Sequence, residues 1–294
     1  MSNLPTYNDL RDAFSQGKGL PKLPGTALEL VRIIDSGSCN ATDLERVIAR
    51  DPSLSAGLLR MANSAMFGGL TSVSTIQGAV MRLGYSSVRS MGLSLAVTAM
   101  VGGNTKAFDA GRFARHNVFV GFLARYFYAR RKALELFKSS WSADEIFSAG
   151  ILHDLPIALL SRVSPAAYEA VVDYSAKRGI SVRTGFQEFF ENSLGALGRI
   201  AADAWTLPSI FGETMEFVEA PFDHGHETIS LACLALADEY ANRSDWAFEG
   251  WGFRTDIDQR VVELIGLAEE DVTTGIEMVG RHAEAFLADT KQAA

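Results

Sequence analysis

Residues 47–68 read VIARDPSLSAGLLRMANSAMFG and combine a helix start signal, an apolar periodicity and a helix stop signal. Asp51 suits a helix N-cap and Pro52 suits the first helical position, where its missing N–H costs no hydrogen bond. Apolar residues then recur at three- and four-residue spacing until the glycine pair Gly68-Gly69. This pattern predicts a helix that ends at the glycines and buries one face. The residues expected on that face are Leu54, Leu58, Leu59 and Met61.

The same spacing continues along almost the whole chain, whereas alternating stretches rich in Val, Ile and Thr are hard to find. We therefore predict an all-α protein. The prolines of LPKLPG at 20–25 exclude a helix there, and a helix is expected to follow at 27–35. Thr42 is expected to cap the next helix in a capping box with Glu45.

Two more helices are predicted between the glycine pair and residue 100. Ser74 is expected to cap a helix through Met81, and Ser86 or Ser87 to open one that runs to about Met100. The segment VGGNTKAFDAG then interrupts the pattern. Beyond it, helices are predicted at about 112–136, 142–153, 155–161, 164–178, 181–192, 193–205, 208–217, 226–242, 257–265 and 269–289.

VGGNTKAFDAG, at 101–111, is the best internal boundary because it combines paired glycines with few apolar residues. It divides one module, 1–294, into an N-terminal bundle of short helices at 1–105 and a second helical bundle at 106–294. No repeat or low-complexity linker separates the two, so we expect them to pack together. Gly68-Gly69 and Gly102-Gly103 are candidate hinge points.

Composition narrows the class of protein. Hydrophobic residues make up 48% of the 294 residues and aromatic residues 10%, which supports a large core and excludes a disordered chain. The formal net charge of −8 repels phosphate backbones and anionic lipid, so nucleic acid is a disfavoured partner. In the basic segment ARYFYARRK at 124–132, helical spacing turns the aromatic residues inward and the cations toward solvent.

Cysteine usage and hydropathy indicate the compartment. Cys39 and Cys233 form no metal-type pair and no disulfide framework, which fits a reducing cytoplasm. The N-terminal stretch MSNLPTYNDLRDAF lacks the apolar core of a signal peptide and is expected to form an amphipathic helix. No unbroken apolar run reaches the roughly 18 residues of a membrane span. We therefore predict a cytoplasmic protein with no membrane-spanning segment.

Three elements in a fixed order closely resemble the opening half of the HDOD family, a group of output domains related to HD phosphohydrolases. They are LPxLP at 20–24, the DPxL…LLRxANSAxF core at 51–67 and AVxRLG at 79–84. The second half agrees more loosely, through FSAGILHDL at 147–155, GALGRIAADAWTLP at 195–208 and LACLALADEY at 231–240. The resemblance covers about residues 18–242. It implies a multi-helix bundle in which an HD-like C-terminal half packs against the short-helix N-terminal bundle.

The resemblance also implies a candidate metal site. The HD superfamily binds metal through a His, an adjacent His-Asp pair and a later Asp, and this chain offers His116, His153, Asp154 and Asp238 in that order. Two imidazoles and two carboxylates suit a single divalent Mn, Fe, Zn or Mg ion, with positions left for water and a phosphate oxygen. The alternative is structural: His153 and Asp154 end one helix and cap or hydrogen-bond the next.

The chain departs from the cyclic-dinucleotide-cleaving branch of that superfamily. After the His-Asp pair this branch has a Gly and a Lys, but here the run is Leu155-Pro156-Ile157, without a cation to steady a phosphoryl group. Histidines for a second metal are replaced by Leu194 and by Val218-Glu219. His224 and His226 lie nearby, in a loop punctuated by Pro and Gly where an exposed or capping role is commoner than metal binding.

These departures predict a non-catalytic regulatory module of bacterial signal transduction, with no catalytic residues and no cofactor beyond one candidate metal. We expect it to act in trans by binding a protein or a small ligand, since no receiver or cyclase segment lies in the chain. The expected partners are signalling proteins of a two-component or cyclic-dinucleotide pathway. The alternative is a metal-dependent phosphohydrolase acting on a nucleotide or another phosphoester.

Overall fold

The computed structural model describes residues 4–68, 71–100, 108–134, 137–248 and 257–292. The regular elements of these residues are helices, as predicted, and no strand is found among them. The first helices are α1 (Tyr7–Ser15), α2 (Gly25–Asp35), α3 (Ala41–Ile48), α4 (Pro52–Asn63), η1 (Ala65–Phe67), α5 (Ile76–Leu83) and α6 (Tyr85–Met100). Those after residue 107 are α7 (Ala110–Leu134), α8 (Ala143–Leu152), α9 (Leu155–Val163), α10 (Pro165–Arg178), α11 (Val182–Phe190), α12 (Leu194–Ala204), α13 (Ser209–Phe217), η2 (Pro221–Asp223), α14 (Thr228–Asn242), α15 (Gln259–Ile265) and α16 (Glu269–Gln292).

The stretch that opened the sequence analysis folds as predicted at its start. The Asp51 side chain accepts the backbone N–H groups of Ser53 and Leu54, both at 3.0 Å, and Pro52 occupies the first position of α4. The predicted end at the glycine pair is wrong: α4 ends at Asn63, because Ser64 is extended, with ψ 137°. The separate 3-10 turn η1 follows and stops at Gly68, whose φ of 77° is readily adopted only by glycine. Three of the four predicted core residues of α4 are buried, and Leu59 is partly buried.

Two predicted caps are wrong by one or two residues. α3 is opened by Asn40 and not by Thr42. The Asn40 side chain accepts the N–H groups of Thr42 and Asp43, and the Asp43 carboxylate accepts the Asn40 N–H in return. Asn is at least as good an N-cap as Thr, so the earlier residue takes the position. Thr75, rather than Ser74, caps α5, and its side chain accepts the Gly78 N–H at 3.1 Å.

The start of α6 also differs from the prediction. α6 begins at Tyr85, directly after Gly84, and not at Ser86 or Ser87. Gly84 has φ 80°, which lets the chain turn from α5 straight into α6. Ser87 therefore lies inside the helix, where its hydroxyl donates to the carboxylate of Asp144 on α8. The predicted boundary at 101–111 falls mostly outside the described residues, as do Gly69, Gly102 and Gly103.

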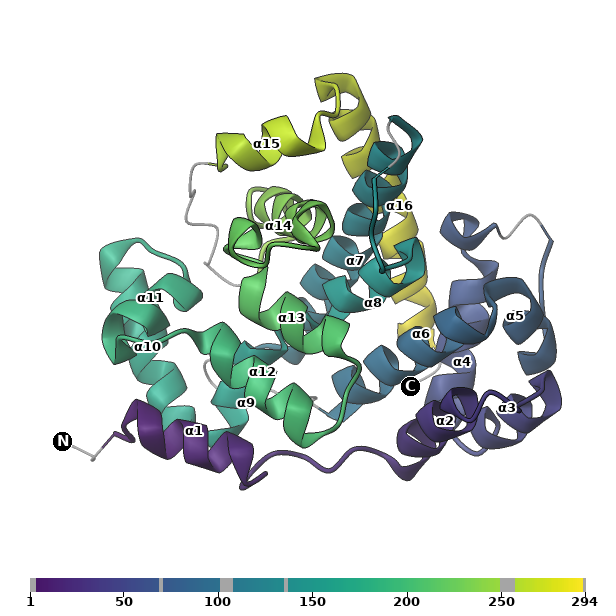
Figure 1. Cartoon of the computed structure of the whole chain (residues 1–294), viewed down its shortest axis with the longest axis horizontal. Helices are drawn as coiled ribbons and strands as arrows, with labels where there is room; N and C mark the ends of the chain where they lie inside the picture. Colours follow the sequence, from purple (N-terminus) through teal and green to yellow (C-terminus); the bar gives the residue numbers. More distant parts are fainter. Residues whose placement is uncertain (1–3, 69–70, 101–107, 135–136, 249–256, 293–294) are drawn as a thin grey trace.

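α7 and α8 lie at the centre of the fold and run antiparallel (Figure 1). At one end of the pair, His116 of α7 meets His153 at the end of α8, with ring centroids 5.5 Å apart. At the other end, Arg125 donates to Asp144 at 3.0 Å. In between, a Cβ on Gly150 would lie 2.6 Å from the Gly121 Cα, so the two backbones are in contact. This close contact fixes how α7 and α8 are aligned along each other, and therefore which residues meet at each end of the pair.

The N-terminal helices contact this central pair at its Arg125–Asp144 end. α6 packs against α8, and the Arg125 guanidinium lies 4.3 Å from the centre of the Phe67 ring of η1. Asp144 therefore receives hydrogen bonds from α6, through Ser87, and from α7. α1 lies elsewhere, packed on α12 among the C-terminal helices (Figure 1). The division of the chain near residue 105 stays a prediction.

One stretch, Ala143–Val163, is long and apolar enough to cross a membrane by composition. It comprises α8 and α9, and 89% of its most apolar window is buried inside the fold. The apolar composition is therefore accounted for by packing in the core. His153 and Asp154 interrupt this stretch at the junction of the two helices, where they are 0% and 6% exposed.

Candidate metal centre

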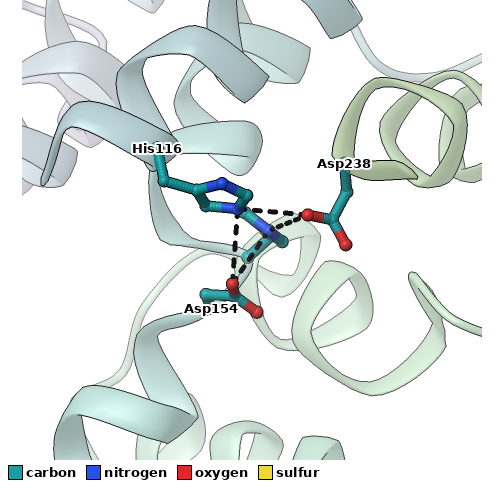
Figure 2. A group of neighbouring side chains, drawn as sticks. His116, Asp154 and Asp238 are labelled. Carbon is teal, nitrogen blue, oxygen red and sulfur yellow. Dashed lines mark ion pairs between the residues drawn. The ribbon is translucent and has the colours of Figure 1, made fainter. Parts of the chain in front are cut away.

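Three separate parts of the chain bring four ligand-type side chains to one point, and Figure 2 labels His116, Asp154 and Asp238 of this group. His116 comes from α7, His153 and Asp154 from the α8–α9 junction, and Asp238 from α14. Their ligand atoms all lie within 4.8 Å of one another. The sequence analysis predicted these four residues as the candidate site, and the fold assembles all of them.

The histidine nitrogens face the carboxylates. His116 Nε2 lies 3.1 Å from Asp238 Oδ1 and 3.6 Å from Asp154 Oδ2. His153 Nε2 lies 3.4 Å and 3.3 Å from the same two oxygens. Neither Nε2 has a hydrogen-bond partner of good geometry within the described chain, although both are buried. Buried polar atoms normally have such a partner, so these two nitrogens are available to a metal ion.

The other ring nitrogens determine the tautomer. Nδ1 of His116 lies 3.1 Å from the Trp246 carbonyl oxygen, and Nδ1 of His153 lies 2.7 Å from that of Gly150. A carbonyl oxygen only accepts hydrogen bonds, so each Nδ1 carries a hydrogen and each ring turns its Nε2 toward the carboxylates. Metal-binding histidines show this arrangement, with the second ring N–H donated to a carbonyl or carboxylate. The four residues therefore fit a divalent cation.

Without a cation, charge within the site is balanced by a proton. Burial opposes charge on His153, but the fields of Asp154 and Asp238 outweigh it and raise the pKa of this imidazole to about 10. Burial acts to raise the pKa of Asp154, yet His153 and Arg183 hold it at about 2. The same kind of competition lowers the pKa of Asp238, with His153 as its main opposing charge. A cation that binds here takes the place of the imidazolium proton.

Arg183 is a site residue that the sequence analysis missed. It lies in the first turn of α11, and its side chain is 7% exposed. Nε donates to Asp154 Oδ1 at 2.9 Å, and Nη2 donates to the His153 carbonyl oxygen at 2.6 Å. The run Leu155-Pro156-Ile157 lacks a cation, but the fold supplies one from another helix. No local pattern distinguishes Arg183 from a surface arginine.

Asn242 is a second missed residue, and its position is easier to explain. Its Nδ2 donates to Asp238 Oδ1 at 2.9 Å, one helical turn further along α14. Residues four apart share a helix face, so an amide at this spacing from a candidate ligand was a usable signal. The bond helps to hold the Asp238 carboxylate toward the histidines.

A pocket of about 350 Å³ opens beside the four residues. Asp154, Asp238 and Arg183 line it, together with parts of α9, α11, α14 and α15. Val218 and Glu219, which replace the second-metal histidines in the sequence comparison, also line it. Leu194, the third replacement, is buried in the core and does not line it. Among the described residues, the four-residue set is the one cluster of ligand-type side chains found.

The remaining candidates have other partners. His224 Nε2 lies 3.1 Å from Glu213 Oε2, and its Nδ1 accepts the Glu227 N–H, while His226 is exposed. Neither histidine joins the four-residue set. In the basic segment of α7, Arg125 pairs with Asp144 and Arg130 with Asp271. Two of its cations are therefore neutralised within the chain.

The order of His116, the His153-Asp154 pair and Asp238 in this helical bundle is the order that the resemblance to the HD-related class implies. Within that class, the family model for the HDOD domain matches residues 20–221. The chain therefore belongs to the HDOD domain family.

Solved structures share the fold over nearly the whole chain. An HDOD domain protein with unknown function from Geobacter sulfurreducens has a TM-score of 0.72 at 18% identity, covering 97% of both chains. A proposed phosphohydrolase from Shewanella amazonensis SB2B has a TM-score of 0.71 at 23% identity, covering 97% of this chain and 98% of that one. A proposed signal transduction protein from Marinobacter aquaeolei VT8 has a TM-score of 0.68 at 18% identity, covering 98% and 67%.

An uncharacterized protein from Treponema pallidum (strain Nichols) is 25% identical over 201 residues. The match covers 67% of this chain and 37% of that protein. The chain therefore spans about a third of the length of this relative.

Proposed function

We propose that this chain is a regulatory module of bacterial signal transduction that holds one divalent cation and does not turn over a substrate. The observation that carries the proposal is the pair of buried, unpartnered Nε2 atoms of His116 and His153 facing two carboxylates. The cation would be held by these imidazoles with Asp154 and Asp238, and it would offer a Lewis-acidic position to an oxygen of a bound ligand. The proposed setting is the cytoplasm.

The rest of the pocket supports a binding role over a catalytic one. Where the cleaving branch has histidines for a second metal, this pocket has Val218 and Glu219. Arg183 could balance charge, but it already donates to Asp154 and to the His153 carbonyl. Glu239 and Asp258 add carboxylates to the lining, which disfavours an approaching phosphate dianion, whereas burial raises the pKa of Glu219 to about 7. The proposed output is therefore ligand or partner binding, and the proposed partners are signalling proteins.

The second candidate function is a one-metal phosphohydrolase. The pocket favours it in one respect, because it reaches both Asp154 and Asp238 and has room for a small phosphoester. In such an enzyme, Arg183 and the cation would bind the phosphoryl oxygens, and a carboxylate would hold the attacking water.

The test is metal analysis of protein purified without chelator, followed by assays against nucleotides, cyclic dinucleotides and p-nitrophenyl phosphate. We expect about one divalent cation per chain, and hydrolysis no faster with wild-type protein than with Asp154→Ala. Hydrolysis that the substitution abolishes would establish the phosphohydrolase instead. Protein that holds no cation, even after incubation with Mn²⁺, Fe²⁺ or Zn²⁺, would overturn the metal-holding proposal.

A further inference from the structure

Arg183 is a buried cationic residue beside a candidate cation site, and both its burial and its charge are energetically unfavourable there. Burying a guanidinium is unfavourable unless its N–H groups are paired, and its positive charge repels a metal ion. Here the N–H groups donate to Asp154 Oδ1, to the His153 carbonyl oxygen and, at 3.4 Å, to the Met215 carbonyl oxygen. Since the charge works against cation binding, the use of Arg183 has to lie in the geometry it imposes.

That geometry concerns Asp154. Oδ1 of Asp154 is occupied by Arg183, which leaves Oδ2 pointing at Nε2 of His153 and of His116. Although Asp154 stands at the N-cap position of α9, its side chain makes no capping hydrogen bond. Arg183 is thus its hydrogen-bonding anchor outside the four-residue set. The same guanidinium holds the His153 carbonyl, so it restrains two consecutive ligands at once.

The helix that carries Arg183 is itself firmly seated. Ser181 caps α11 by accepting the Thr184 N–H at 3.0 Å. Two residues after Arg183, a Cβ on Gly185 would lie 1.8 Å from Ser175 Oγ, so α11 approaches α10 as closely as glycine allows. The terminal torsion of an aspartate is broad and two-fold, so its carboxylate can rotate. A guanidinium held by a firmly packed helix can fix the orientation of that carboxylate.

We propose that Arg183 is a positioning residue that makes Asp154 a one-oxygen ligand and so sets the metal preference of the site. The inference rests on the proposed metal site. Two imidazole nitrogens and one oxygen from each carboxylate suit transition ions such as Zn²⁺ and Co²⁺. Ca²⁺ needs six to eight oxygens and often a bidentate carboxylate, which Asp154 does not offer while Arg183 holds Oδ1. Arg183 therefore selects against Ca²⁺ through the side chain that it orients.

The test compares Co²⁺ and Ca²⁺ binding in wild-type protein and Arg183→Lys. Lysine keeps the positive charge but loses the planar fork, so the comparison isolates positioning from charge. We expect Co²⁺ affinity to fall by about 10- to 100-fold and the preference for Co²⁺ over Ca²⁺ to fall with it. The visible spectrum of bound Co²⁺ should change, because the Asp154 oxygens bind differently.

The matched control is Arg125→Lys at the opposite end of the α7–α8 pair. Arg125 also pairs with an aspartate, at 3.0 Å, but it touches none of the four ligands. We expect its Co²⁺ affinity and spectrum to match those of wild type. If Arg183→Lys fails to fold, Arg183→Gln replaces it, because a neutral amide is less costly to bury; the same loss of preference is expected.

Three outcomes decide the matter. Weaker Co²⁺ binding, a smaller preference for Co²⁺ over Ca²⁺ and an altered spectrum in the Arg183 variant, with none of these in the control, support the proposal. Unchanged Co²⁺ affinity and spectrum in a folded Arg183 variant overturn it and leave the metal site standing. If wild-type protein binds no Co²⁺, both the proposed metal site and the role of Arg183 are wrong.

Discussion

The two ends of the α7–α8 pair are held together by different chemical groups. At one end, Arg125 and Asp144 carry opposite charges, and Ser87 donates to the same carboxylate. At the other end, His116 and His153 face two carboxylates, and their Nε2 atoms have no hydrogen-bond partner in the described chain. The first end is saturated and joins two groups of helices. The second leaves two buried nitrogens without such a partner, which is why we propose this end, and not the first, as the binding site.

The largest effect on cation binding is expected when one of the four candidate ligands is removed. Asp238→Ala deletes one of the two carboxylates that face both histidines. We expect Co²⁺ affinity to fall by more than about 100-fold, beyond the loss typical of residues that only support a ligand. Isothermal titration with Co²⁺ measures the change. Asp258→Ala, on the same pocket but outside the four-residue set, is the control and should bind as wild type does.

The next largest effect is expected on stability, at the Gly121–Gly150 contact that fixes the alignment of α7 and α8. Gly150→Ala places a Cβ 2.6 Å from the Gly121 Cα, and a backbone atom cannot rotate away. We expect the free energy of unfolding to fall by about 3 kcal/mol in urea titrations. A Cβ on Gly25 would meet no atom within 4 Å, so Gly25→Ala is the control, with a change below about 1 kcal/mol. Equal stability of the two variants would contradict the close crossing.

The incomplete end should also respond to pH. A cation must displace the proton held by His153, whose pKa is raised to about 10, so Co²⁺ affinity should rise about tenfold per pH unit between pH 6.5 and 8.5. The stability of the metal-free protein has the opposite dependence on pH, because it falls as the pH rises. Its stabilisation from the charged imidazole is complete below about pH 6.5 and is lost as the pH rises through about 10.

Titrations of Co²⁺ at several pH values test this slope. His224→Gln is a suitable control, since His224 pairs with Glu213 away from the site. The slope should be the same in that variant. A Co²⁺ affinity that does not change with pH would mean that His153 is neutral before the cation binds.

The smallest effect is expected at the saturated end. Ser87→Ala removes one hydroxyl donor from Asp144 and should lower the free energy of unfolding by about 1 kcal/mol. Co²⁺ affinity should not change, because Arg125 still holds the carboxylate. Urea unfolding and Co²⁺ titration together check both statements. A marked loss of Co²⁺ affinity would show that the two ends communicate through the helices.

Local signals explain how much of this structure was predictable. Asp51-Pro52 marks a helix start by steric and hydrogen-bonding rules that act within four residues, and the structure confirms it. The start of α3 was misplaced because Asn40 and Thr42 are both acceptable caps two residues apart, and local rules rank them too closely. Element types were therefore easier to predict than element ends.

The site divides in a similar way. His116, His153, Asp154 and Asp238 were predictable because a family pattern fixes their order along the chain. Arg183 was not, since its role depends on how α11 packs beside the α8–α9 junction, which no nearby residue specifies. Burial of a charged side chain is a property of the assembled fold. The sequence accordingly predicted the ligands but not the residue that orients one of them.

The spread of the four ligands along the chain has a consequence for how the protein forms. A cation bound to His116 and Asp238 would act as a cross-link that closes a very long loop, and such links restrict the unfolded chain most. It can form only where α14 packs on α7, as it does in the folded protein. Metal binding would then distinguish molecules in which α14 has docked on α7 from molecules in which it has not.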